Sequence, residues 1–104
     1  MDKVQAHKKI CSYLNDLYER KNHDYGDSFH QTYIEEGMAM ARIRLGDKFN
    51  RFKTLSRGYD IQKGIVKKVG EEQKVPDESL RDTLLDLANY AIMTVLELDE
   101  GKFE

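Results

Sequence analysis

The segment 78–98, ESLRDTLLDLANYAIMTVLEL, carries apolar side chains around about half of its circumference when it is drawn as a helix at about 100° per residue. Two neighbouring sides make up this arc. One side consists of Leu80, Leu84, Leu87, Ala91, Val95 and Leu98, and the other of Leu85, Ala88, Ile92 and Leu96. An ordinary surface helix has a narrower stripe, so this helix is expected to be central in a bundle or covered by a second subunit. Asp77 is its predicted N-cap, and Glu78 puts negative charge in its first turn, where the helix dipole favours it.

Two further segments have apolar residues at helical spacing, 4–22 and 33–56. The stripe of the second consists of Ile34, Met38, Ala41, Leu45, Phe49 and Phe52. Gly37 and Gly46 each weaken this helix by about 1 kcal/mol relative to Ala, so we expect one long helix with a bend at a glycine. The glycine-punctuated segment 58–75 is a loop, a short hairpin or a lid. The chain is therefore predicted to be all-α, an antiparallel bundle of three main helices with an irregular segment before the last one.

Composition narrows the class of protein. The 104 residues form one predicted domain, 1–104, with 35% charged residues and a net charge of −2. No apolar run approaches the roughly 18 residues of a membrane span, and the N-terminus lacks a secretory signal, so we expect a cytoplasmic protein without membrane contact. The net charge argues against general nucleic-acid binding. The lone Cys11 is predicted to be a buried, inert thiol, and the three histidines do not form a zinc pattern.

Three carboxylates follow one narrow stripe beside the apolar arc. The stripe consists of Glu78, Asp82, Asp86 and Asn89, at steps of four, four and three residues. Like charges at this spacing repel, and Mg²⁺ prefers hard oxygen ligands, so Glu78, Asp82 and Asp86 are candidate magnesium ligands. A solvated acidic face, or salt bridges to a neighbouring helix, explains the spacing equally well.

A basic stripe in the 33–56 helix matches the acidic one. Arg44, Lys48 and Arg51 lie next to its apolar positions. They either neutralise Asp82 or Asp86 across a helix interface or hold a phosphate group.

The stretch KNHDYGDSFH, residues 21–30, is a turn between two helices with more chemistry than a turn needs. Gly26 fits a helix end, and Asp27 or Ser28 fits the N-cap of the next helix. That explanation does not require His23, Asp24 or Tyr25.

Three motifs, KNHDYGDSF, DKFNRF and DESLRDTLLDLANYAIM, resemble the nucleotide modification associated domain 1 family, small proteins frequent in phages and prophages. The resemblance covers most of residues 21–93. It implies deoxynucleotide metabolism or modified-base pathways, and a host cytoplasm if the chain is phage-encoded.

A more distant resemblance links the bundle to the all-α nucleoside triphosphate pyrophosphohydrolases of the MazG and dimeric dUTPase type. Those enzymes hold magnesium through an E-x-x-E pair and an E-x-x-D pair. This chain departs from the pattern, with Glu35-Glu36 in place of the first pair and Glu78-x-x-x-Asp82 in place of the second.

With a nucleotide as ligand, the predicted substrate-binding residues are Lys21, His23, Asp24, Tyr25, Gly26, Lys48, Arg51, Asn89 and Tyr90. Tyr25 offers a face for a base, and Lys21 and His23 offer donors for phosphate or sugar oxygens. One hypothesis is a magnesium-dependent pyrophosphohydrolase with Glu78 and Asp82 as catalytic residues. A second is a non-catalytic module that sequesters a nucleotide or a nucleotide-derived signal, and a third is a helical protein whose motif residues form salt bridges only.

Oligomerisation is a further expectation, because three helices do not cover both sides of the 78–98 arc. We expect a homodimer or a larger homo-oligomer. In such an assembly the 21–29 turn of one chain is expected to face the acidic stripe of another.

Overall fold

The computed structural model describes residues 2–25, 27–62, 65–68 and 79–101, with the backbone alone for 24–25 and for the strands. Four helices account for most of these residues: α1 (Lys3–Tyr25), α2 (Ser28–Glu36), α3 (Met38–Ser56) and α4 (Leu80–Glu100). The strands β1 (Tyr59–Gln62) and β2 (Ile65–Lys68) pair antiparallel, with Tyr59 opposite Lys68. The hairpin is one of the three structures expected for the segment 58–75. The helical fold class is confirmed.

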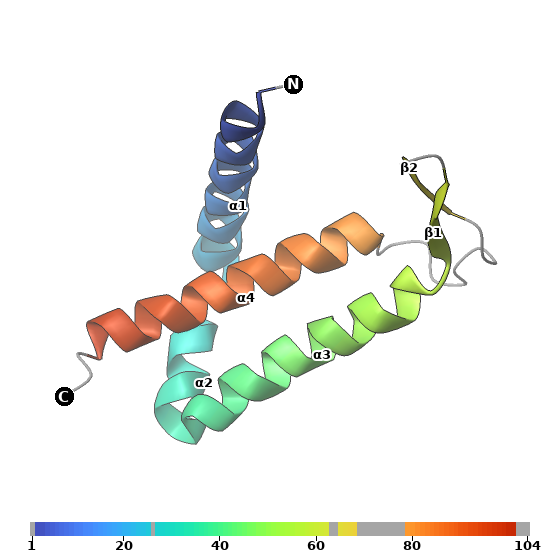
Figure 1. Ribbon diagram of the computed structural model, residues 1–104. Helices are drawn as coiled ribbons and strands as arrows, with labels where there is room; N and C mark the ends of the chain where they lie inside the picture. Colours follow the sequence, from blue (N-terminus) through green and yellow to red (C-terminus); the bar gives the residue numbers. More distant parts are fainter. Residues whose placement is uncertain (1, 26, 63–64, 69–78, 102–104) are drawn as a thin grey trace.

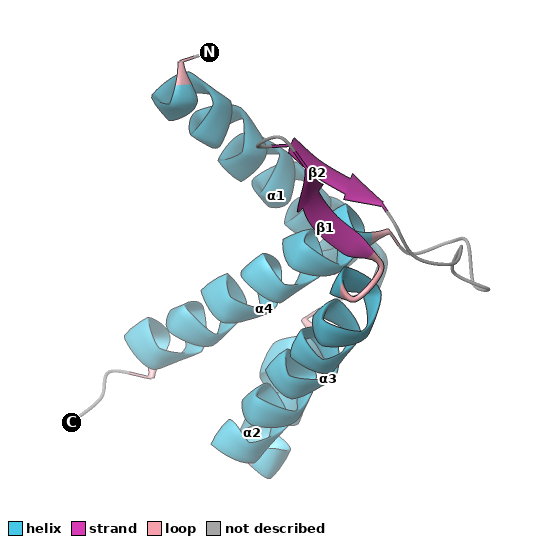
Figure 2. Ribbon diagram, turned by 45° about the vertical axis from the view of Figure 1, so that its right-hand side comes forward, coloured by secondary structure: helices cyan, strands magenta, loops and turns pink. Residues whose placement is uncertain are grey.

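α3 and α4 lie side by side and run in opposite directions (Figure 1). α2 crosses one end of this pair, and α1 meets α4 only near its own C-terminal end, so that its N-terminal part projects away from the other helices (Figures 1 and 2). The arrangement is therefore an α3–α4 pair with two shorter contacts rather than an evenly packed three-helix bundle.

The single long helix predicted for 33–56 is wrong in one respect, because Gly37 divides it into α2 and α3. Gly37 has φ 73° and ψ −158°, a combination that is essentially restricted to glycine. Its backbone N–H donates to the carbonyl of Tyr33 at 2.7 Å, which ends α2. The helix α2 begins at Ser28, before the 33–56 stripe, and the prediction of Asp27 as one of two candidate N-caps is confirmed, because its carboxylate accepts from the backbone N–H of His30 at 3.3 Å.

The break at Gly37 changes which apolar residues are covered. Phe29, Met40 and Ala41 form the buried cluster, and Tyr33, Met38, Tyr90 and Met93 pack against it. Ile34 and Phe49, which belong to the predicted stripe, are 66% and 49% exposed. A continuous helix would have kept Ile34 and Met38 on one face, but the turn at Gly37 rotates the two parts relative to each other.

The α4 helix begins at Leu80 with Ser79 as its N-cap, so the prediction of Asp77 as N-cap and of a start at Glu78 is wrong. Ser79 Oγ accepts from the backbone N–H of Asp82 at 3.0 Å, and the Asp82 carboxylate accepts from the backbone N–H of Ser79 at 3.4 Å. This reciprocal pair is a capping box. A serine followed three residues later by a carboxylate explains why the helix starts here.

The expected burial of Cys11 is also wrong, because Cys11 lies on the projecting part of α1 and is exposed. Among residues 3–23 of α1, Leu14 alone is buried. The side-chain amide of Asn89 donates to the carbonyl of Leu14 at 3.2 Å and fixes this point of α1 on α4. In the described ranges, no helix combines the length and the hydropathy needed to cross a lipid bilayer.

Candidate functional site

A cavity of about 220 Å³ lies where the end of α1 and the start of α2 meet α3 and α4. Its lining comes from all four helices: Tyr18, Lys21 and Asn22 of α1, Asp27, Ser28 and Phe29 at the start of α2, Arg44 of α3, and Asp86, Asn89, Tyr90 and Met93 of α4. The turn between α1 and α2 and the stripe on α4 therefore meet within one chain. The expectation that they face each other across two chains is not needed to bring them together.

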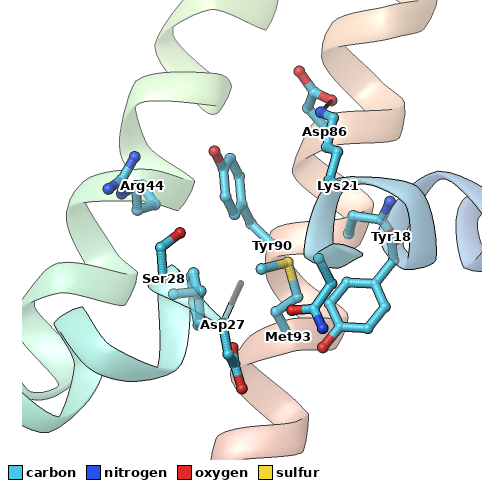
Figure 3. A pocket seen from close by; sticks show the side chains of 11 residues that line it. Tyr18, Lys21, Asp27, Ser28, Arg44, Asp86, Tyr90 and Met93 are labelled. Atoms are coloured by element: carbon cyan, nitrogen blue, oxygen red, sulfur yellow. Dashed lines mark ion pairs between the residues drawn. The ribbon is translucent and has the colours of Figure 1, made fainter. Parts of the chain in front are cut away.

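The centre of the cavity is aromatic and apolar. The rings of Phe29 and Tyr90 stack with their centroids 6.0 Å apart and an interplanar angle of 23°. Figure 3 shows Tyr90 and Met93 in the middle, with Arg44 and Ser28 on one side and Lys21 and Tyr18 on the other. A flat, weakly polar ligand group fits between such walls.

The rim of the cavity near Asp86 is charged. Lys48 Nζ lies 3.0 Å from one carboxylate oxygen of Asp86, and Lys21 Nζ lies 3.8 Å from the other. Both Lys48 and Asp86 are about one-quarter exposed, while Lys21 is largely exposed. One carboxylate therefore faces two ammonium groups, and Arg44 adds a further cation to the lining. Lys21, Lys48 and Arg44 thus supply three positive charges at the cavity, against the two carboxylates of Asp86 and Asp27.

Four of the predicted site residues line this cavity: Lys21, Asp86, Asn89 and Tyr90. Lys48 is joined to them through its ion pair with Asp86, which confirms the predicted neutralisation of the acidic stripe by the basic stripe. Arg51 follows Lys48 on α3, outside the lining of the cavity. His23 lines a different hollow on α1, together with Tyr13, Asp16, Glu19 and Arg20.

Other predicted residues lie outside what the structure describes. They are Gly26 and Glu78, together with the side chains of Asp24 and Tyr25. Asp82 is described, and its carboxylate is part of the capping box at the exposed start of α4. Of the predicted magnesium ligands, Asp82 and Asp86 thus each have another partner in the folded chain.

A second polar cluster, which was not predicted, joins α2 to the end of α4. His30 Nδ1 donates to the two carboxylate oxygens of Glu97, at 2.7 and 3.0 Å, and Glu97 is 7% exposed. The hydrogen bond to Glu97 raises the pKa of His30, although partial burial acts in the opposite direction. Burial raises the pKa of Tyr18, and the charges of Asp27, Glu100 and Glu97 raise it further.

The sequence holds a signal for Glu97, because Asp86, Tyr90, Met93 and Glu97 follow steps of four, three and four residues on one face of α4. His30, Glu97 and Glu100 place their ligand atoms within 4.8 Å of one another, which is a donor set that a divalent cation accepts. The ion pair between the partly exposed His30 and the buried Glu97 satisfies these two members without a cation.

Comparisons with known proteins give one match. A family model described as nucleotide modification associated domain 1 matches residues 21–98. No curated protein and no solved structure matches the chain. The matched region contains every residue of the cavity lining except Tyr18.

Proposed function

Because the chain belongs to the nucleotide modification associated domain 1 family, we propose that its four-helix cavity binds a nucleotide without hydrolysing it. The observation that carries this proposal is the pairing of cations and stacked rings in the same cavity. Lys21 and Arg44 stand on opposite sides of Tyr90, whose ring stacks on that of Phe29. A phosphate group needs the cations, and a nucleotide base needs the aromatic rings.

The cations suit phosphate oxygens. Guanidinium groups bind phosphate bidentately, and ammonium groups bind it as point charges. Lys21 lies 3.8 Å from Asp86, at the long end of an ion pair, so a phosphate can replace this carboxylate as its partner while Lys48 still neutralises Asp86 at 3.0 Å. Asn22 supplies an amide for a base or sugar edge.

The geometry favours binding over hydrolysis. A magnesium site built on the α4 stripe needs carboxylates that face the phosphate with free oxygens. The Asp82 carboxylate caps α4, and the Asp86 carboxylate faces two lysines. These two residues do not fit the role of magnesium ligands in this conformation, so we derive no hydrolytic step through a metal.

The family description favours a deoxynucleotide or a modified nucleotide as the ligand. A phage source, a cytoplasmic location and a relationship to the MazG-type enzymes stay predictions.

The test is a calorimetric titration of the purified chain with nucleoside mono-, di- and triphosphates, canonical and modified, in the presence of either Mg²⁺ or EDTA. We expect binding that persists in EDTA and a ligand that is recovered unchanged. Arg44→Ala is expected to raise the Kd by about 10- to 100-fold, since a hydrogen bond to a charged group contributes roughly 1.5–3 kcal/mol.

Arg42→Ala is the matched control, because Arg42 lies on the same helix and is exposed but does not line the cavity. Equal effects of the two substitutions, or the absence of binding by every nucleotide, would contradict the proposal. Release of pyrophosphate that requires Mg²⁺ would contradict the binding proposal and support the pyrophosphohydrolase hypothesis instead.

A further inference from the structure

The α4 helix leaves a long apolar face uncovered. Its face toward the other helices carries the apolar Leu85 and Met93 together with polar residues, of which Thr83 and Glu97 are 0% and 7% exposed. The opposite face carries Leu84, Ala88, Ala91, Val95 and Leu98, here called the α4 seam. Leu84 and Val95 of the seam are 41% and 51% exposed. An apolar face of this length is normally covered.

We propose that the α4 seam packs against the α4 seam of a second copy, antiparallel and around a two-fold axis that passes between Ala88 and Ala91. The steps along the seam are four, three, four and three residues, the spacing at which two helices interlock along one line. The order of side chains is also self-complementary. Large residues lie at both ends and two alanines at the centre, so that Leu84 meets Val95 of the partner subunit and the backbones approach closely at the alanines.

The exposed area of the chain supports a large contact. The accessible surface is 8346 Å², whereas a compact monomer of 12.2 kDa exposes about 6,100 Å². The radius of gyration is 16.2 Å, against about 13 Å for a compact domain of this length. The excess is about 2,200 Å², to which the projecting part of α1 contributes as well as the seam, and each partner in a stable complex buries roughly 800 Å².

The charges beside the seam favour an antiparallel orientation of the two α4 helices. Arg81 lies in the first turn of α4 and Asp99 in the last, and both are exposed. Each charge has the unfavourable sign for the dipole of its own helix. In the antiparallel pair, Arg81 and the partner's Asp99 lie at the same height and on the same side of the seam, because both are about 60° from Leu84 on the helix. The charges of Arg81 and Asp99 are therefore unfavourable in the monomer and become favourable in the dimer, where each faces an opposite charge.

This contact lies on the face of α4 opposite the cavity, so it does not depend on the proposed nucleotide binding. The first experiment is sedimentation velocity of the full chain at micromolar concentration. We expect twice the chain mass of 12.2 kDa. A monomeric wild-type chain would overturn the proposal.

The substitution Ala91→Glu tests whether the α4 seam forms the dimer contact. It retains a good helix former and places a charge at the centre of the seam. This variant is expected to sediment as a monomer with an unchanged far-UV circular dichroism spectrum. Ala39→Glu is the matched control, because Ala39 is an exposed alanine on α3. A dimer that survives Ala91→Glu, or that Ala39→Glu disrupts equally, would place the contact elsewhere.

Charge exchange tests the orientation. Arg81→Asp is expected to raise the dimer dissociation constant several-fold without a loss of helix content, because the new charge suits its own helix dipole but faces the partner's Asp99. The double variant Arg81→Asp/Asp99→Arg is expected to restore the wild-type constant. A failure of this restoration would contradict the antiparallel arrangement.

A disulfide supplies a second test of the orientation. In a Cys11→Ser background, Leu84→Cys/Val95→Cys is expected to give covalent dimers on oxidation. The single variant Leu84→Cys is not expected to give covalent dimers. In an antiparallel pair, position 84 of one chain lies about 16 Å from position 84 of the other, whereas a disulfide needs Cα atoms within about 7 Å. Equal crosslinking of both variants would indicate a parallel pair and overturn the proposal.

Discussion

The imidazole of His30 lies 2.7 Å from the Glu97 carboxylate, and this hydrogen bond holds the pKa of His30 above its ordinary value of 6.5. The folded protein therefore binds this proton more tightly than the unfolded chain does. The stabilisation is complete below about pH 6.5 and is lost as the pH rises through the raised pKa. We predict that the free energy of unfolding falls over this range, measured by urea unfolding at a series of pH values.

Two variants isolate this contribution. His30→Gln is expected to remove the part of the pH dependence that starts near pH 6.5, whereas His7→Gln is expected to retain it, because His7 lies exposed on the projecting part of α1. Identical pH profiles of the wild type and of His30→Gln would show that the His30–Glu97 pair does not change proton binding on folding.

At the same scale, the sequence identified the residues that share one helix face and the Lys48–Asp86 pair between two helices, but not the His30–Glu97 pair. Lys21, Asn89 and Tyr90 were predicted and line the cavity, and Asp86 was predicted with them. His30 and Glu97 were missed because 67 residues separate them, and no spacing rule connects two positions on different helices. Their contact exists only once Gly37 has turned α2 against the end of α4.

At the scale of the helices, two glycines with the same appearance in the sequence behave differently. Gly37 has φ 73° and separates α2 from α3, whereas Gly46 lies within α3. A Cβ atom meets no other atom within 4 Å at either position, so backbone conformation alone decides the effect.

We predict that Gly37→Ala lowers the free energy of unfolding by about 1–3 kcal/mol, because alanine strongly disfavours this conformation. Gly46→Ala is expected to raise it by about 0.5–1 kcal/mol, because alanine is the better helix former. Urea unfolding of both variants provides the measurement, and each serves as the control for the other. A rise in the free energy of unfolding for both variants would show that α2 and α3 form one continuous helix in solution.

The capping box at the start of α4 gives a second prediction at this scale. Ser79→Ala removes the acceptor for the Asp82 backbone N–H and is expected to cost about 1 kcal/mol. Ser12→Ala, an exposed serine within α1, is expected to be neutral or slightly stabilising. Thermal unfolding of both variants measures the difference, and an equal response would leave Ser79 without a capping role in solution.

The start of α4 also shows the limit of capping rules in the sequence. Asp77, Ser79 and Asp82 all suit a helix N-terminus, and the position of Asp77 directly after Pro76 favours it in the sequence. The structure selects Ser79 because only this position has a carboxylate three residues later that reaches back to it. A reciprocal pair thus has more weight than a single good capping residue.

At the scale of the whole molecule, ion pairs join α4 to the other helices, while several large apolar side chains are exposed. The ion pair of Lys48 with Asp86 joins α3 to α4, and that of His30 with Glu97 joins α2 to α4. The wide apolar arc of α4 was evident from the sequence. The side of the arc that faces inward was not evident from the sequence, because the polar side faces inward only when other helices supply partners for its charges.

The proposed dimer makes stability depend on protein concentration. Since unfolding separates two chains, each tenfold increase in concentration adds about 1.4 kcal/mol to the free energy of unfolding of the dimer. With an unfolding entropy of about 2.1 cal/mol/K per residue over two chains, the Tm is expected to rise by about 3 °C per tenfold increase. Scanning calorimetry over about a hundredfold range of concentration measures this slope, and Ala91→Glu is expected to show none. A wild-type Tm that is independent of concentration would mean that α4 stays folded with its seam exposed, and the apolar face would then require a partner other than a second copy.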